Sequence, residues 1–113
     1  MIADSGVLQK SHDLLSYGMG LVSKFPRDQR FLLGDRIQKI LLDVQLDTIA
    51  AYYETKAQKK SILKTINIKL EQLRWLFRLS FEKRFLTFKK QLFVVSEIDV
   101  MGRMIGGWLK SLK

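Results

Sequence analysis

Apolar residues recur at spacings of three and four along almost the whole chain, and this helical period constrains the fold more than any other feature. In the first segment, apolar pairs return every seven positions, at Val7/Leu8, Leu14/Leu15 and Leu21/Val22. A seven-residue return is the spacing of a helix that packs in a bundle. The sequence contains no alternating β-branched run and no Asn-Gly or Asp-Gly turn that would indicate a strand. The chain is therefore predicted to be all-α.

Three breaks divide this pattern. Pro26 ends the first helix, because proline cannot continue the hydrogen-bond ladder, and Asp28 is expected to cap the second. The polar stretch 55–60 is the expected second connection, and Thr87 is the expected cap of the last helix. Long helices with short connections predict one domain, residues 1–113, folded as an up-down four-helix bundle. The expected helices span residues 5–24, 29–55, 61–84 and 88–112.

Two of these helices carry more apolar surface than one core can cover. The core face expected on the third helix is Ile62, Ile66, Leu70, Leu73 and Phe77. A second apolar strip runs along the second helix, separate from its core face. Another strip runs along the third helix, beyond its core face. Continuous exposed strips are unusual on a monomer, so a closed homo-oligomer is expected to cover them. The residues of the two strips are Leu42, Leu46, Ile49, Tyr53, Ile68, Trp75 and Leu79.

Glycines within the expected helices indicate close packing of a neighbour, because glycine weakens a helix interior. Gly18 and Gly20 have this position in the first helix. Gly102 and Gly106 stand four apart in the last helix, where small residues would let another backbone approach.

Positive charge is concentrated in the second half of the chain. The whole chain carries 20 Lys and Arg against 11 Asp and Glu, a net charge of +9. Residues 1–54 hold six basic and seven acidic side chains, whereas residues 55–113 hold fourteen and four. A polyanion, either nucleic acid or an anionic membrane, is the expected partner, and a merely solvated face is the alternative. The candidate nucleic-acid-binding residues are Lys56, Lys60, Lys64, Arg74, Arg78, Lys83 and Arg84.

The sequence offers few residues that could form a catalytic or metal-binding site. The chain has no cysteine and one histidine, His12, and it has no Glu-x-x-His pair of the kind that builds a di-metal site in a helix bundle. Asp43 and Asp47 stand one turn apart, and ion pairing explains them better than a shared metal. No enzyme activity, metal or cofactor is expected. No signal peptide and no apolar run of about 18–20 residues is visible, so a cytoplasmic protein is expected.

Three segments together resemble one family. They are residues 25–37 (FPRDQRFLLGDRI), 73–79 (LRWLFRL) and 101–110 (MGRMIGGWLK). In this order they are similar to the four-helix-bundle accessory variability determinant proteins of diversity-generating retroelements. The resemblance implies a basic homopentamer shaped as a barrel that binds RNA or DNA with little sequence preference. It also implies association with a reverse transcriptase in mutagenic retrohoming, and it places Arg74 and Arg78 on the binding face.

Three other interpretations stay open. The basic surface could grip an acidic protein partner, or it could lie on a membrane surface. The third alternative is a related group of four-helix proteins that are encoded within intervening sequences of large-subunit ribosomal RNA genes. The chain lacks their Ser-Ile-Pro-Ser-Asn motif, which favours the retroelement group.

Overall fold

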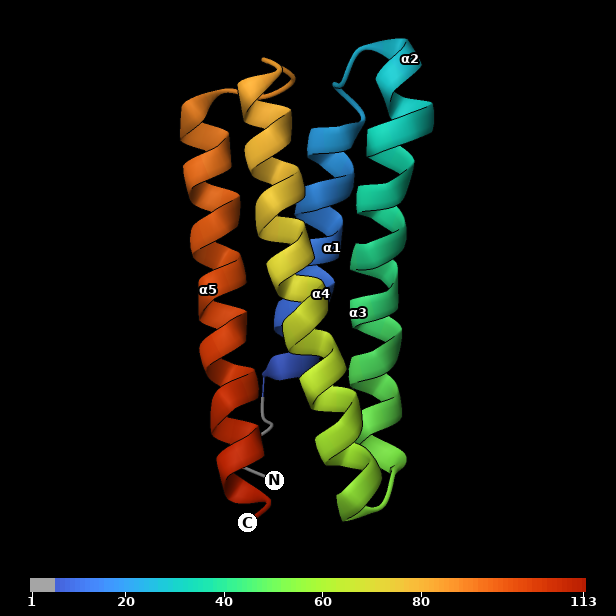
Figure 1. Cartoon of the computed structure of the whole chain (residues 1–113), viewed down its shortest axis with the longest axis vertical. Coiled ribbons are helices and arrows are strands. Elements are labelled where there is room, and N and C mark those ends of the chain that lie inside the picture. Colours follow the sequence, from blue (N-terminus) through green and yellow to red (C-terminus); the bar gives the residue numbers. More distant parts are fainter. Residues whose placement is uncertain (1–5) are drawn as a thin grey trace.

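A computed structural model describes residues 6–113 as an up-down bundle of four long helices, with no strand in this part of the chain (Figure 1). The molecule measures 44 × 23 × 19 Å. Helix α1 packs between α3 and α5, and α4 packs between the same two helices on the other side. The predicted all-α bundle is thus confirmed. The elements are α1 (Val7–Val22), α2 (Arg27–Gln29), the π-helical turn η1 (Arg30–Gly34), α3 (Asp35–Tyr53), α4 (Lys56–Glu82) and α5 (Phe88–Ser111).

The core follows the apolar faces that the helical period predicts, with one exchange. On α4, Ile66, Leu70, Leu73 and Phe77 are buried as expected, but Leu63 is buried in place of the predicted Ile62, and Ile62 is only half-buried. At about 100° per residue, positions 62 and 63 lie equally far to either side of the core direction, so the period alone does not choose between them.

Two helix starts differ from the sequence prediction. Helix α4 begins at Lys56, so residues 56–60 of the expected connection belong to the start of a helix and Thr55 is its cap. Thr55 caps it by accepting a hydrogen bond from the main-chain N–H of Gln58 at 3.4 Å. Asp28 is not a cap, because it lies in the first turn of α2. The expected start of the first helix at residue 5 lies outside the described residues, within which α1 begins at Val7.

The predicted cap of the last helix is confirmed. The Thr87 hydroxyl oxygen accepts a hydrogen bond from the main-chain N–H of Lys90 at 3.2 Å, and α5 begins at the next residue, Phe88. Satisfying an otherwise unpaired N–H in this way stabilises the first turn of a helix.

The π-helical turn η1 between α2 and α3 was not predicted. It places Gly34 against α1 so tightly that a Cβ there would lie 2.7 Å from Cγ1 of Val22 and 3.3 Å from the main-chain oxygen of Gln29. Only glycine fits this approach without a shift of the neighbours. The same wide turn leaves Phe31 and Leu32 exposed at the surface.

Gly18 and Gly20 have opposite surroundings, which gives a matched test of helix packing. A Cβ at Gly18 would lie against Cδ1 of the buried Leu41, whereas nothing lies within 4 Å of a Cβ at Gly20. We expect Gly20→Ala to raise the free energy of unfolding by about 0.5–1 kcal/mol, because alanine favours the helix. We expect Gly18→Ala to lower it by about 1 kcal/mol or more, because the core is overpacked there. Urea denaturation measures both, and equal stabilities would contradict the close packing of α1 on α3.

Candidate nucleic-acid interface

The predicted binding residue Arg74 is held by two carboxylates at the middle of the bundle. Its Nε donates to Oδ1 of Asp99 on α5 at 2.8 Å, and its Nη1 donates to Oε1 of Glu71 at 2.7 Å. Burial alone would lower the pKa of Arg74, but the hydrogen bonds to Asp99 and then to Glu71 outweigh it and raise that pKa. The guanidinium is therefore a charged but partnered group that ties α4 to α5.

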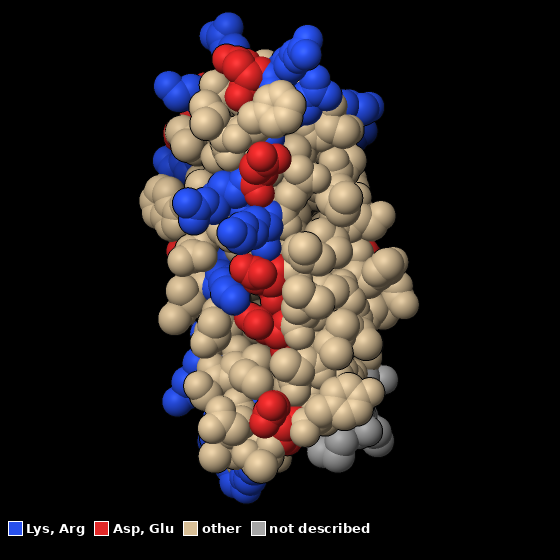
Figure 2. All heavy atoms as spheres, turned by 90° about the vertical axis from the view of Figure 1, so that its right-hand side faces the viewer, with Lys and Arg blue, Asp and Glu red and all other residues tan. Residues whose placement is uncertain are grey.

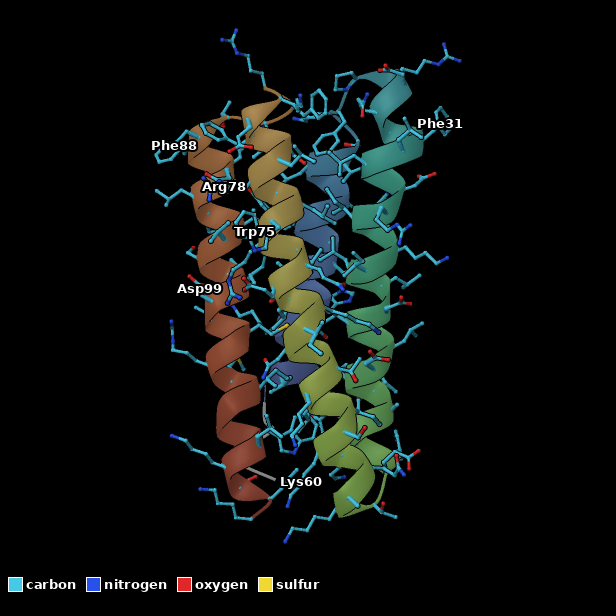
Figure 3. All side chains as sticks on the ribbon, viewed as in Figure 1. Phe31, Lys60, Trp75, Arg78, Phe88 and Asp99 are labelled. Carbon is cyan, nitrogen blue, oxygen red and sulfur yellow. The ribbon has the colours of Figure 1, made fainter. Side chains whose placement is uncertain are left out.

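Arg78, one turn further along α4, is also partnered. Its Nε lies 3.2 Å from Oε2 of Glu82, and its guanidinium lies 5.4 Å from the ring centre of Trp75. Figure 3 shows Trp75 and Arg78 on neighbouring turns of α4, with Asp99 close by on α5. Carboxylates thus balance the positive charge of both Arg74 and Arg78.

The remaining predicted residues lie near opposite ends of α4. Lys56, Lys60 and Lys64 belong to its first turns, whereas Lys83 and Arg84 follow its last. At about 1.5 Å per residue, position 60 and position 84 are roughly 36 Å apart. One protomer therefore does not bring the seven predicted residues into a single patch. Near the start of α4, the Lys56 ammonium already donates to the main-chain oxygen of Lys113 at 3.1 Å.

The other end of the bundle gathers positive charge from two segments that are far apart in the sequence. Because the helices alternate in direction, the connections at residues 23–26 and 83–87 meet at this end, here called the loop end (Figure 1). Figure 2 shows basic side chains at this end with acidic ones among them, and mixed charges along the flank. Residues 23–30 and 82–90 contain seven basic and two acidic side chains. The basic ones are Lys24, Arg27, Arg30, Lys83, Arg84, Lys89 and Lys90.

The contribution of Lys24, Arg27 and Arg30 to this end was not predicted from the sequence. These residues follow the first helix, in the half of the chain that has no net positive charge. The signal that could have found them is the topology itself, because an up-down bundle places its first and third connections together.

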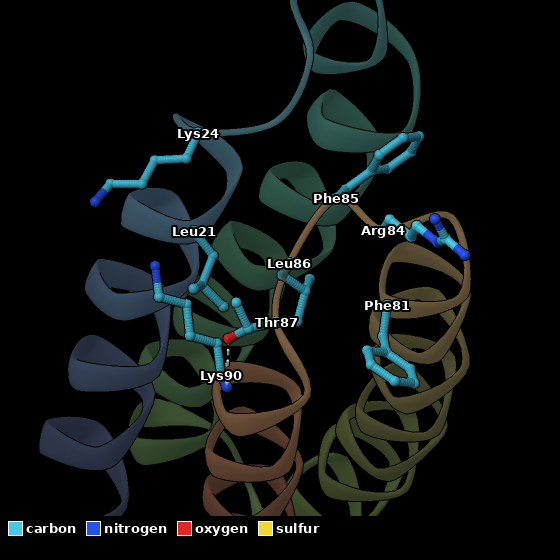
Figure 4. Close-up of a pocket in the computed structure, with 8 residues that line it drawn as sticks. All are labelled: Leu21, Lys24, Phe81, Arg84, Phe85, Leu86, Thr87 and Lys90. Carbon is cyan, nitrogen blue, oxygen red and sulfur yellow. Dashed lines mark hydrogen bonds between the residues drawn. The ribbon is translucent and has the colours of Figure 1, made fainter.

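The surface of the loop end is hollowed between α1, α4 and α5 (Figure 4). The hollow has a volume of about 380 Å³ and combines apolar side chains with three cations, and none of its lining residues is acidic. Lys24, Arg84 and Lys90 contribute the cations. Leu21, Phe81, Phe85, Leu86 and Thr87 complete the lining.

Arg84 occupies a backbone position that normally belongs to glycine. Its φ is +66°, and it follows the end of α4 in a Schellman motif. In this motif the Arg84 N–H donates to the main-chain oxygen of Phe81 at 2.9 Å, and the Phe85 N–H donates to that of Ser80 at 2.8 Å. A side chain in the left-handed region costs about 1 kcal/mol. Arginine at this position therefore lowers the stability of the fold and places a cation in the lining of the hollow.

The apolar residues predicted to form a subunit interface are all exposed on the protomer. Exposure reaches 86% at Tyr53 on α3 and 59% at Trp75 on α4. Trp75 and Ile68 also line an apolar groove of about 600 Å³ with Ile40 and Leu76. The close approach expected at Gly106 is not found in the protomer, since nothing within the described chain lies within 4 Å of a Cβ there. At Gly102 the nearest group is the Arg74 guanidinium, at 3.5 Å from such a Cβ.

Neither a metal cluster nor a membrane span is found in the described part of the chain. Residues 6–113 contain no group of three or more His, Cys, Asp or Glu side chains that could hold a metal ion. None of their helices combines the length and the apolar character that crossing a bilayer requires.

A comparison with protein families adds independent information. A family model described as bAvd-like matches residues 6–112, which is nearly the whole chain. A search of the curated proteins for relatives of this sequence finds no match.

Replacing Arg84 by glycine tests the backbone strain at the hollow. Glycine adopts a φ of +66° without steric cost, so we expect Arg84→Gly to raise the free energy of unfolding by about 1 kcal/mol. Arg84→Lys keeps the strain and should leave stability almost unchanged. Urea denaturation measures both variants, and a destabilised glycine variant would show that the guanidinium supports the fold.

Proposed function

Because the chain belongs to the bAvd-like family of accessory variability determinant proteins, we propose that it is a non-enzymatic nucleic-acid-binding protein of a diversity-generating retroelement. It binds RNA or DNA without sequence preference, associates with the retroelement's reverse transcriptase, and supports mutagenic retrohoming. The cytoplasm is its proposed location. The observation that carries nucleic-acid binding is the loop end, whose segments contain seven basic side chains, three of which line a hollow that has no acidic lining residue.

The chemistry of this end suits a phosphate backbone. Lysine and arginine side chains displace the counterions that condense on nucleic acid, and the resulting affinity is independent of sequence and sensitive to salt. Lys83 and Arg84 remain in the proposed site, and Lys24, Lys89 and Lys90 join them. The proposal gives Arg74 and Arg78 a lesser part, because each already pairs with a carboxylate.

We also propose that the protein is a closed homo-oligomer, with five subunits as the family resemblance implies. The exposed strips on α3 and α4 support subunit contact, since continuous apolar strips are costly to leave in water. A ring repeats the loop end around an axis, and several weak sites acting together bind one strand much more tightly than a single site does.

A salt titration with matched charge removals tests the binding surface. We expect Lys83→Gln combined with Lys89→Gln to weaken binding to unrelated RNA and DNA. The slope of log affinity against log salt should fall by about one for each phosphate that the variant no longer neutralises. Lys60→Gln combined with Lys64→Gln removes the same charge near the other end and should have a smaller effect. Fluorescence anisotropy measures both pairs.

Two outcomes of that titration would overturn parts of the proposal. If the pair at residues 60 and 64 has the larger effect, the loop end is not the main binding surface. If the unaltered protein binds neither RNA nor DNA even at low salt, the basic surface serves an acidic protein partner instead.

Negative charges introduced into the apolar strip of α3 test the proposed homo-oligomer. We expect the unaltered protein to have a solution mass of several 13.2 kDa protomers. Leu42→Glu combined with Leu46→Glu should reduce it to one protomer without unfolding, because both side chains are already exposed. The control, His12→Glu combined with Ser16→Glu, adds the same charge on an exposed face of α1 and should leave the mass unchanged. Light scattering measures the mass, and a monomeric unaltered protein would contradict the proposal.

A further inference from the structure

The hollow at the loop end combines an apolar floor with a rim of cations. Leu21 and Leu86 form part of the floor and are almost fully buried, at 6% and 9% exposure. Lys24, Arg84 and Lys90 come from three separate segments: the end of α1, the end of α4 and the first turn of α5. Figure 4 shows Lys24 and Lys90 on one side of the hollow and Arg84 on the opposite side, with the charged ends directed outward. The arrangement suits a ligand that is apolar at one end and anionic at the other.

The aromatic rings of this hollow are fixed by other rings. Phe81 packs against Phe88 with ring centres 5.6 Å apart, and Phe85 packs against Phe25 at 5.5 Å. Rings held in place lose little freedom when a ligand stacks on them, which is how single-strand-binding proteins present aromatic platforms to bases.

The three cations of the hollow also differ from those at the middle of the bundle. Lys24, Arg84 and Lys90 form no ion pair with any described residue, whereas Arg74, Arg78 and Lys69 all pair with carboxylates. Arg84 is moreover kept at a position that favours glycine. Unpaired charges around an apolar floor indicate a site for an anion that also carries a flat apolar group.

We propose that this hollow holds one unpaired nucleotide of a single strand, with its base on the apolar floor and the flanking phosphates near the cations on either side, Lys24 and Lys90 on one side and Arg84 on the other. This inference rests on the proposed nucleic-acid binding and adds a preference for single strands to it. A base inside a duplex is stacked on both faces and paired at its edge, so only an unpaired base can enter. A bare anion would need the cations alone and would gain nothing from Leu21 and Phe81.

The test compares a single-stranded oligonucleotide with a blunt hairpin of equal phosphate number. We expect the unaltered protein to bind the single strand at least about fivefold more tightly. Arg84→Gln should remove most of this preference, whereas Lys83→Gln removes the same charge beside the hollow and should preserve it. Arg84→Gly removes the backbone strain and should also lose the preference for the single strand. A loss of preference in a variant that is more stable cannot be due to unfolding.

Competition identifies the part of the nucleotide that is recognised. Adenosine monophosphate should displace the single strand at lower concentration than inorganic phosphate does, because only the nucleotide offers a base to the floor. Equal competition by the two, or equal affinity for the single strand and the hairpin, would overturn this inference while leaving the proposed function standing. A failure to bind either nucleic acid would overturn both.

Discussion

The packing of four apolar helix faces around one core determines where every other feature of this protein lies. The apolar faces of α1, α3, α4 and α5 meet in one core, and the short connections between these helices require them to run alternately up and down. That alternation brings the connections after α1 and α4 to one end and the connection after α3 to the other. The basic residues of two distant segments therefore meet because of core packing, with no direct attraction between them.

Charge is arranged differently along the length of the bundle. In the middle, Lys10 pairs with Glu97, Lys69 with Asp47 and Arg74 with Asp99, so that ion pairs join neighbouring helices. At the loop end, the cations that line the hollow have no such partners within the described residues. A bound polyanion can supply the missing negative charge there, whereas in the middle it would compete with carboxylates already in place.

The helical period was enough to predict the four-helix fold. It did not predict the features that depend on single residues, such as the start of α4 and the ion pairs. It predicted α5 and its cap Thr87, but it took residues 55–60 for a connection because they are polar. Lysine favours helices, and Thr55 provides a cap, so α4 begins there. The pairing of Arg74 with Asp99 joins residues 25 positions apart on two helices, and no local pattern shows it. Predicting the hollow would have required the topology of the bundle and the left-handed backbone at Arg84, and composition reveals neither of them.

The proposed function depends above all on nucleic acid binding at the loop end of the bundle. Ultraviolet cross-linking of the purified protein to a uridine-containing single strand, followed by mass spectrometry of the peptides, is the decisive test. We expect cross-links to concentrate in residues 81–90 and 21–30, which surround the hollow. Cross-links concentrated in residues 56–64, with none at the loop end, would contradict binding there.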